Sequence, residues 1–328
     1  MSEALRVVSI GGGHGLSALL EGLKKYTHSG SHRIDITAIV TVTDDGGSSG
    51  RLRREFDVLP PGDIRNCMVA LSDDGALLSR LFQYRFKAGH GLKGHSFGNL
   101  FLTALTEITG DFSDAVRSSA EVLNIAGRIF PSTAANVALE AVLEDGKVLR
   151  GETRISRSRH RISRIRLQPA RVRPLKEALQ AIAQADLITL GPGSLFTSVI
   201  PNLLVAGIPK AIRQSPARKV YFMNLMTQPG ETTSFSASDH VAAVHTHARC
   251  KLLDSVVVST SRVSPRIRQR YAEQNAGPIA IDTHALEAMG LDVIGADLLQ
   301  KGFKVRHNPA AIARVALEMA IEAARSRL

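Results

Sequence analysis

The hydrophobic pattern of the chain alternates between two periodicities. Short apolar runs rich in β-branched residues predict buried strands at 7–10, 34–42, 186–190, 221–225 and 255–260. Stretches with apolar residues three or four positions apart predict helices at 16–23, 67–71, 114–123 and 175–185, and a last helix after Asn308-Pro309. Because strands alternate with helices, we predict an α/β fold with a mostly parallel sheet.

One segment departs from this alternation. Between residues 136 and 168, apolar positions alternate with polar ones, and Glu144-Asp145-Gly146-Lys147 has the composition of a hairpin turn. We predict strands on both sides of this turn, at 137–143 and 148–155, and a third short strand at 162–167. The segment is therefore a small β-rich insertion.

Four glycines fall within five residues between the first strand and its helix: Gly11, Gly12, Gly13 and Gly15, with His14 among them. Glycine lets a backbone approach a ligand closely, and the free N–H groups at a helix start attract an anion. The frame Gly13-x-Gly15-x-x-Ala18 also satisfies the dinucleotide-binding pattern. We predict that this turn contacts phosphate. The alternative is a turn that only redirects the chain.

The same order of strand, glycine turn and helix start returns at residues 186–203. The turn is Gly191-Pro192-Gly193-Ser194, and Thr197 and Asn202 follow it. Ser194 lacks the frame of a nucleophile elbow, and no Lys-Ser/Thr pair follows as in a Walker loop. Because the carboxyl ends of parallel strands meet at one edge, the two turns should face each other across a cleft. We predict that both hold the phosphates of one ligand.

The second predicted strand leads to Asp44-Asp45 and then to the glycine- and serine-rich run 46–50. An acid in this place can reach a ribose hydroxyl, whereas two adjacent carboxylates could instead hold Mg²⁺ against a diphosphate. The run could form a second anion-binding turn, in which Ser48 or Ser49 caps a helix and Arg51 adds positive charge. A polar turn with an ordinary helix cap is the alternative.

Further polar residues stand at predicted helix starts and strand ends. Asp63 is placed to cap a helix whose first turn could direct Asn66 into the cleft, and Asn99 stands at a similar helix start. Tyr271 could stack on a base, and Arg306 could bind phosphate. For each of these residues, an ordinary structural or surface role is the alternative.

The composition changes this picture mainly through charge. The 328 residues are 44% hydrophobic, the first residues lack a signal peptide's apolar segment, and two cysteines cannot build a zinc site. Because no apolar run approaches the ~20 residues of a membrane helix, we expect a cytoplasmic protein without membrane insertion.

The formal charge is +11, and one short stretch carries eight arginines against one acid: 154, 157, 159, 161, 164, 166, 171 and 173. We interpret this arm as a solvated face and do not expect nucleic acid as a partner.

Six motifs together identify a family: G-G-G-H-G-L-S, T-D-D-G-G-S-S-G-R-L-R, L-P-P-G-D-I-R-N-C, G-H-S-F-G-N-L, G-P-G-S-L-F-T-S-V-I-P-N-L and M-T-Q-P-G-E-T. They occur in this order between Val7 and Pro309, and in them the chain resembles the YvcK-type gluconeogenesis factors of the 2-phospho-L-lactate transferase (CofD-like) superfamily. The resemblance implies one CofD-like domain over residues 1–328, with a three-layer α/β/α Rossmann-like sheet. Residues 136–168 would be its insertion, carrying the Arg-rich arm.

The resemblance also implies a function: a cytoplasmic regulatory protein that binds a nucleotide-diphosphate sugar such as UDP-N-acetylglucosamine. Such a protein would be required for cell shape and cell-wall morphogenesis during gluconeogenic growth. We expect a homodimer with a cell-wall synthesis or regulatory protein as partner; binding needs no cofactor, although Mg²⁺ could accompany the ligand. The alternative is a Mg²⁺-dependent phosphotransferase of the 2-phospho-L-lactate transferase type, with Asp44 and Asp45 as catalytic metal ligands. The G-G-S-S-G-R-L-R continuation resembles the gluconeogenesis factors and favours binding.

Overall fold

A computed structural model of the protein describes residues 4–28, 33–72 and 77–326. At its centre is a sheet built from β1 (Leu5–Gly11), β2 (Ile34–Val40), β3 (Arg128–Pro131), β7 (Leu187–Leu190), β8 (Arg218–Phe222), β9 (Ser255–Ser259) and β10 (Asp292–Ala296). The strand order is β10-β9-β8-β7-β1-β2-β3, and all neighbours run parallel. The predicted α/β fold is confirmed.

The central strand β1 lies between β2 and β7. Its Val7 pairs with Ile36 on one side and with Leu187 on the other, and all three side chains are fully buried. Strands covered on both faces read as continuous apolar runs, which explains why the sequence pattern located them. Their ends differ from prediction, because β2 stops at Val40 and β8 already begins at Arg218.

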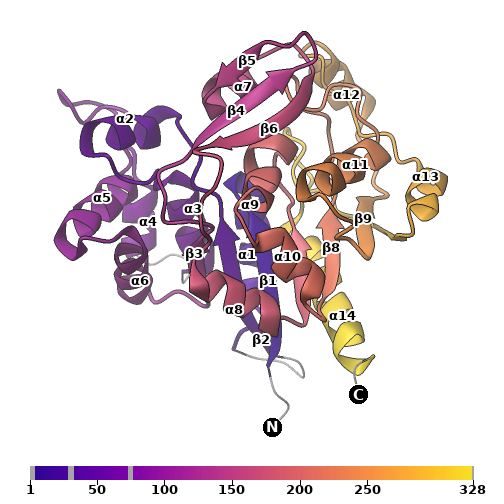
Figure 1. Cartoon of the computed structure of the whole chain (residues 1–328), viewed down its shortest axis with the longest axis horizontal. Coiled ribbons are helices and arrows are strands. Elements are labelled where there is room, and N and C mark those ends of the chain that lie inside the picture. The colour runs from indigo at the N-terminus through magenta and orange to yellow at the C-terminus, as the bar shows by residue number, and fades with distance from the viewer. Residues whose placement is uncertain (1–3, 29–32, 73–76, 327–328) are drawn as a thin grey trace.

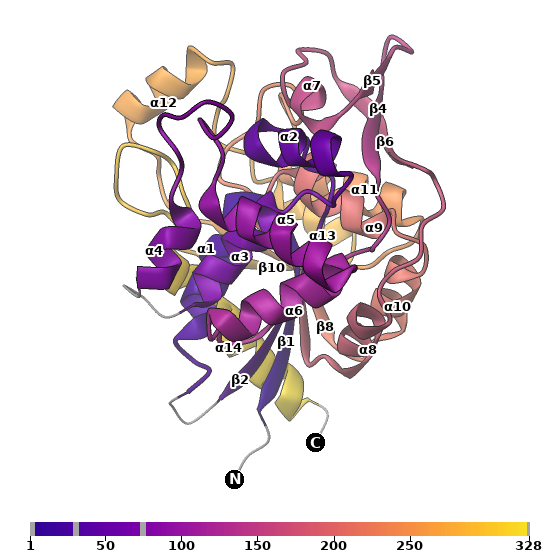
Figure 2. The same ribbon diagram turned by 90° about the vertical axis from the view of Figure 1, so that its left-hand side faces the viewer.

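Helices cover both faces of the sheet and give the molecule three layers (Figures 1 and 2). On one face, α1 (Gly13–Lys24) packs against α3 (Gly62–Leu71) and α14 (Pro309–Arg325). The other face carries α8 (Lys176–Gln184), the π-helical turn η1 (Leu195–Val199), α9 (Ile200–Leu203), α10 (Ile208–Gln214) and α11 (Ala237–Ala248). The remaining helices are α2 (Gly47–Phe56), α4 (Leu77–Gln83), α5 (Phe97–Thr109), α6 (Phe112–Val122), α12 (Pro265–Ala272) and α13 (Thr283–Ala288).

The insertion forms a separate antiparallel sheet in the order β5-β4-β6, seen at the top of Figure 1. Its elements are β4 (Ala138–Leu143), β5 (Val148–Arg150), α7 (Glu152–Ser156) and β6 (Ile162–Gln168). The predicted strand 148–155 is wrong in its second half. Gly151 adopts a φ of +95°, which directs the chain out of the strand and into α7.

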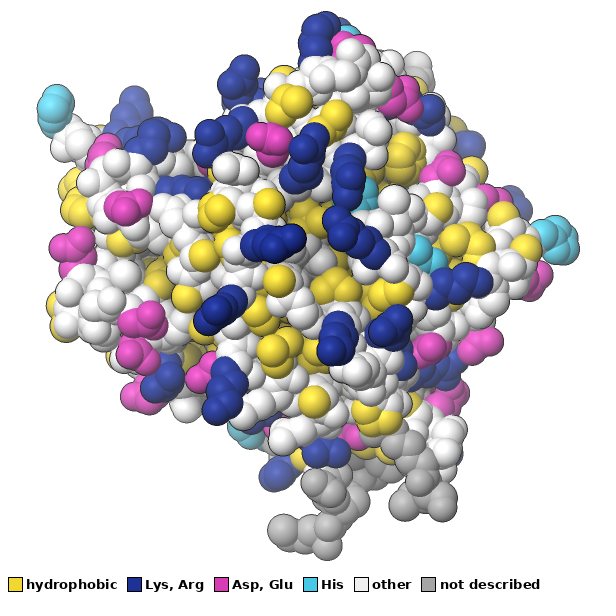
Figure 3. All heavy atoms as spheres, in the orientation of Figure 1, with side chains coloured by type: hydrophobic (Ala, Val, Ile, Leu, Met, Phe, Trp, Pro, Cys, Tyr) yellow, Lys and Arg dark blue, Asp and Glu magenta, His cyan; other side chains and the backbone are white. Residues whose placement is uncertain are grey.

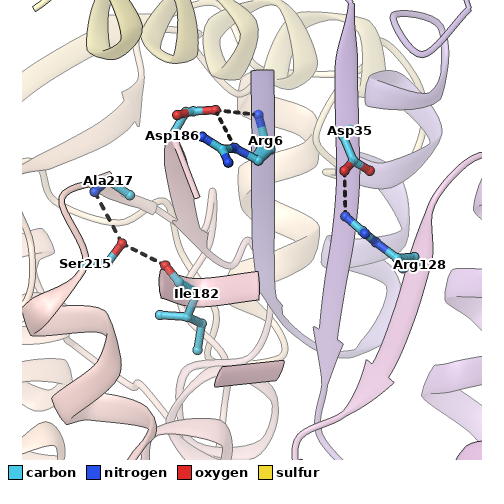
Figure 4. A network of polar contacts seen from close by, with 7 residues as sticks. All are labelled: Arg6, Asp35, Arg128, Ile182, Asp186, Ser215 and Ala217. Carbon is cyan, nitrogen blue, oxygen red and sulfur yellow. Dashed lines mark hydrogen bonds and ion pairs between the residues drawn. The ribbon is translucent and has the colours of Figure 1, made fainter. Parts of the chain in front are cut away.

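Ion pairs fix the amino ends of the central strands (Figure 4). The Asp186 carboxylate accepts hydrogen bonds from the backbone N–H of Arg6 at 2.7 Å and from its guanidinium at 3.4 Å. Next to this pair, Arg128 donates to Asp35 at 2.6 Å and joins β3 to β2. The charged pairs therefore stand at the edge opposite to the glycine turns.

Within the described part of the chain, no single helix has both the length and the apolar character needed to cross a membrane. Helices Leu195–Leu203 and Ile208–Gln214 meet that criterion only as a pair, across a 77° bend.

Candidate functional site

The two glycine turns follow the two strands at which the sheet changes direction. From β1 the strand order proceeds to β2 and β3, whereas from β7 it proceeds the opposite way to β8, β9 and β10. The crevice outside the carboxyl ends of two such strands is where open α/β sheets bind ligands. The first turn follows β1 and the second follows β7, so both open into this crevice.

The two turns pack directly against each other. A Cβ atom at Gly15 would lie 2.3 Å from the Pro192 carbonyl oxygen, which no side chain could tolerate. A Cβ atom at Gly193 would lie 3.2 Å from the Gly12 carbonyl oxygen. Behind the turns, Asn202 Nδ2 donates to the Gly11 carbonyl oxygen at 3.2 Å. The glycines are therefore required for the approach of one backbone to another.

A cavity of about 1120 Å³ opens over both turns. Most of the predicted site residues line it: Gly12, Gly13, His14, Gly15, Asp44, Ser48, Ser49, Asn66, Asn99, Gly193, Ser194, Thr197, Tyr271 and Arg306. The structure thus brings the two distant turns to one hollow, and contact with a ligand remains a prediction. The α1 start at Gly13 lines this space, and the first N–H groups of a helix have no intrahelical acceptors.

Five predicted site residues lie outside the cavity lining: Gly11, Asp45, Arg51, Gly191 and Asn202. They have structural partners instead. The N–H of Gly191 donates to the Ile10 carbonyl oxygen at 2.9 Å, and Arg51 donates to the Lys93 carbonyl oxygen at 2.9 Å. Asn202 supports the first turn through Gly11. The structure does not place these five residues in the cavity lining, and their contact with a ligand stays a prediction.

Asp45 attaches the insertion to the sheet. Its Oδ1 accepts hydrogen bonds from the Thr153 backbone N–H at 2.8 Å and from the Thr153 hydroxyl at 2.7 Å. Asp44 faces the cavity, and its Oδ1 accepts the N–H of Gly46 at 2.8 Å. The two adjacent carboxylates therefore have different hydrogen-bond partners, and only Asp44 lines the cavity.

This separation bears on Mg²⁺, which takes octahedral oxygen ligands and usually one or two carboxylates besides phosphate. Of the predicted pair, only Asp44 lines the cavity. Among the residues that the structure describes, no group of three or more His, Cys, Asp or Glu side chains is arranged to hold a metal ion. The predicted two-aspartate magnesium site does not fit this geometry.

Ser48 and Ser49 do not cap α2. The N-cap is Gly46, and the serines lie inside the first turn. Ser48 Oγ lies 3.0 Å from His95 Nδ1, and Ser49 Oγ accepts a hydrogen bond from Asn99 Nδ2 at 3.3 Å. Both contacts tie the start of α2 to the start of α5. The first turns of α2 and α5 are therefore hydrogen-bonded to each other and together form one wall of the cavity.

Two acids line the cavity that the sequence had not predicted as site residues. Asp63 was predicted as a helix cap, but it accepts a hydrogen bond from the backbone N–H of Gly13 instead. Burial, followed by the charge of Asp44, raises the pKa of the Asp63 carboxyl to about 7. Glu152 lies at the start of α7, where burial and then Asp44 and Asp63 raise its pKa to about 9. Raised pKa values of this kind reduce the negative charge that would repel a phosphate.

Two amides also escaped prediction. Asn224 exchanges two hydrogen bonds with the backbone of Gly193, and Gln228 Nε2 donates to Ser194 Oγ at 2.8 Å. A signal existed for Gln228, which belongs to a polar motif after a predicted strand. Asn224 was hidden inside the predicted strand 221–225, whereas β8 ends at Phe222.

Another part of the cavity wall comes from α12 and from the segment 300–307. Tyr271 lies in α12, which buries none of its side chains, and its hydroxyl accepts the N–H of Val305 at 3.1 Å. His307 lies 3.1 Å from the Met223 carbonyl oxygen through Nε2, and burial lowers its pKa to about 4. His307 is therefore neutral at pH 7, and Arg306 supplies the positive charge of this wall.

None of the eight arginines of the Arg-rich arm lines the cavity. All eight are exposed, and in β6 they alternate with the buried Ile165 and Leu167. In Figure 3 their face shows dark blue Lys and Arg side chains spread over β6 and α10, with yellow hydrophobic atoms between them. This exposure agrees with the interpretation of the arm as a solvated basic face.

Comparison with known proteins places these features in a family. A family model described as 2-phospho-L-lactate transferase CofD matches residues 7–299. The chain is 47% identical over 313 residues to the gluconeogenesis factor of Halalkalibacterium halodurans, covering 95% of each chain. It is 46% identical over 321 residues to the gluconeogenesis factor of Bacillus subtilis, covering 97% of this chain and 99% of that one. A crystal structure of a UPF0052 family member from Bacillus halodurans matches with a TM-score of 0.92 and 45% identity, covering 97% of this chain and all of that chain.

Proposed function

The chain belongs to the 2-phospho-L-lactate transferase CofD family and, within it, to the gluconeogenesis factors, and from this premise we propose that it binds a nucleotide-diphosphate sugar. The ligand is of the UDP-N-acetylglucosamine type, and the protein acts as a regulator rather than as an enzyme. We place its role in cell shape and cell-wall morphogenesis during gluconeogenic growth, as a cytoplasmic homodimer that acts on a protein partner.

One observation carries the proposal: both glycine turns line the same cavity at the point where the sheet changes direction. A diphosphate suits this place, because N–H groups of the α1 start can bind its oxygens and Ser194 lines the same cavity. Its two ends then extend along the cavity walls. Tyr271 and Arg306 offer an aromatic face and a positive charge on one of them.

Calorimetric titration of the full chain with UDP-, GDP- and NAD-type ligands, with and without Mg²⁺, tests this function. We expect UDP-N-acetylglucosamine to bind with or without Mg²⁺. Arg306→Gln should weaken binding about tenfold or more, as expected for a lost charge-assisted hydrogen bond of about 1.5–3 kcal/mol. Arg268→Gln is the matched control, because Arg268 is exposed on α12 and does not line the cavity. If no member of the panel binds, or if both variants behave alike, the proposal is wrong.

A second candidate is the transferase acting on a nucleotide-diphosphate donor. It is supported by Asp63 and Glu152, since carboxyl groups with raised pKa values in a cavity are typical of acid–base sites. Incubation with labelled UDP-N-acetylglucosamine separates the two functions. The binding function predicts no release of mononucleotide, whereas release that disappears in Glu152→Gln would favour the transferase.

A further inference from the structure

The positive charges of the cavity lie at two separate ends. Arg306 comes just before α14 and follows Val305, whose N–H donates to Tyr271 of α12. Arg65 lies in the first turn of α3, and Arg85 follows α4. Figure 1 shows α4 and α5 at the left of the molecule and α12 at the right, so the cavity extends between these groups of elements. The nucleotide end proposed above leaves the Arg65–Arg85 end without an assigned ligand.

The guanidinium of Arg65 is held in place by its neighbours. Its Nη1 donates to Ser96 Oγ at 2.6 Å, and its Nη2 donates to Asn66 Oδ1. Its aliphatic stem lies over Gly98, where a Cβ atom would come within 2.9 Å of Arg65 Cγ and Cδ. A cation fixed on three sides is ready for an oxyanion, because little side-chain entropy is lost on binding.

Arg85 adds a second guanidinium to this end. Its Nη1 donates to the Gly94 carbonyl oxygen at 2.7 Å, and its residue pairs with Ser96 in an isolated antiparallel bridge. Burial lowers the pKa of Arg65, and the charge of Arg85 lowers it further. The charges of Asp63 and Asp44 raise the pKa of Arg65 in opposition, and an anion that bridged the two guanidinium groups would add to this compensation.

Hydrogen-bond donors near Arg65 and Arg85 have no described protein acceptor. Among the residues that the structure describes, no carboxylate forms an ion pair with Arg65 or Arg85. Because Asn66 accepts through Oδ1, its amide NH₂ group remains a donor, and no described residue accepts a hydrogen bond from it. The charges of both ends act on His14, because Arg306 and Arg65 lower its pKa after burial does.

We propose that Arg65, Arg85 and Asn66 bind the oxyanion of a second ligand, a phosphate monoester or a carboxylate, beside the nucleotide sugar. This subsite rests on the proposed function only for the position of the nucleotide sugar at the other end. The two arginines would bind the oxyanion through paired N–H groups, and the neutral amide of Asn66 would donate one further hydrogen bond that orients it. The protein then reads two ligands in one cavity, so the level of a small anion can be sensed together with that of the sugar nucleotide.

The test uses inorganic phosphate and malonate as the phosphate and carboxylate probes. Each is titrated calorimetrically into the full chain at constant ionic strength, with and without saturating UDP-N-acetylglucosamine. We expect at least one probe to bind in both conditions, and Arg85→Gln to weaken that probe fivefold or more. Arg85→Lys, which keeps the charge but loses the fork, should be intermediate. Arg80→Gln is the control, because Arg80 is exposed on α4 and does not line the cavity.

Three results would overturn the subsite: neither probe binds, Arg85→Gln and Arg80→Gln bind the probe equally, or UDP-N-acetylglucosamine displaces the probe competitively. The last result would mean that the arginines serve the diphosphate itself. If UDP-N-acetylglucosamine fails to bind, the proposed nucleotide function is wrong, and the comparison of Arg85→Gln with Arg80→Gln still decides the anion subsite. Thermal unfolding of each variant checks that its fold is retained.

Discussion

Gly193 and Asn224 hold each other through two hydrogen bonds. The N–H of Gly193 donates to Asn224 Oδ1 at 3.2 Å, and Asn224 Nδ2 donates to the Gly193 carbonyl oxygen at 2.8 Å. The pair ties the second glycine turn to the chain leaving β8, two residues after its end at Phe222. The turn that faces the proposed diphosphate is therefore fixed before a ligand arrives, and a fixed turn binds with a smaller loss of entropy.

Asn224→Ala should lower both stability and affinity. Each hydrogen bond contributes about 1 kcal/mol net, so we expect the free energy of unfolding to fall by about 1–2 kcal/mol. The affinity for UDP-N-acetylglucosamine should fall severalfold, measured by calorimetry. Asn224→Asp keeps an acceptor for the Gly193 N–H, but it sets a carboxylate oxygen against the Gly193 carbonyl oxygen and a negative charge in the cavity, so it should weaken binding more than Asn224→Ala. Unchanged affinity in Asn224→Ala would show that the second turn plays no part in binding.

Gly15→Ala should separate the two turns. The new methyl group would lie 2.3 Å from the Pro192 carbonyl oxygen, so one backbone must move. Overpacking of this kind costs about 1–3 kcal/mol, and the displaced turn should weaken ligand binding tenfold or more. Gly277→Ala is the matched control, because nothing lies within 4 Å of its Cβ position. Denaturant unfolding and calorimetry measure the two effects, and equal behaviour of the variants would contradict the packing argument.

Asp63→Asn should change how stability depends on pH. The pKa of Asp63 is raised from 3.8 to about 7, so between about pH 4 and 7 the folded state holds a proton that the unfolded state releases. The free energy of unfolding of the wild type therefore loses this contribution as pH rises through that window. The amide of the variant does not titrate, so the melting temperature of Asp63→Asn relative to wild type should rise by several degrees from pH 5 to pH 8.

The control for this pH series is Glu55→Gln, an exposed acid outside the cavity lining. Its melting temperature should follow that of the wild type across the series. If Asp63→Asn also follows the wild type at every pH, Asp63 is not the proton-binding group described above.

Asp45→Ala should loosen the insertion. Because Asp45 accepts two hydrogen bonds from Thr153, we expect a loss of about 1–3 kcal/mol in unfolding free energy and faster hydrogen exchange in α7. Thr153→Val removes the hydroxyl contact alone and should reproduce part of the effect. The opposite result, an unchanged α7 with a loss of Mg²⁺-dependent ligand binding, would restore Asp45 as a metal ligand.

The sequence predicted the fold and the meeting of the two glycine turns for one physical reason. Parallel strands buried on both faces leave continuous apolar runs, and their carboxyl ends must share one edge. Gly13 and Gly193 could therefore be placed at one cleft although they are 180 positions apart in the sequence. The last helix was equally readable, because the side chain of Asn308 caps it and Pro309 follows in its first turn.

The sequence could not predict cavity residues that loops and the insertion bring to the site from other parts of the chain. Arg85 reaches the cavity through the segment between α4 and α5, and Glu152 arrives with the insertion, so no local pattern reports either. Asp45 stands beside Asp44 in the sequence, yet only the position of Thr153 decides that the two carboxylates separate. The polar residues at strand ends marked the region correctly, while their individual partners were set by tertiary contacts.

The most direct test of the central claim follows backbone amides during ligand binding. The chain has 27 glycines, so protein labelled with ¹⁵N-glycine gives a small set of amide resonances that assignment by substitution can resolve. On addition of UDP-N-acetylglucosamine, we predict that the resonances of Gly13, Gly15 and Gly193 shift together, while those of Gly110 and Gly290, which lie outside the cavity lining, stay in place. Shifts that spare both turns while the ligand binds would contradict the claim that the diphosphate lies against them.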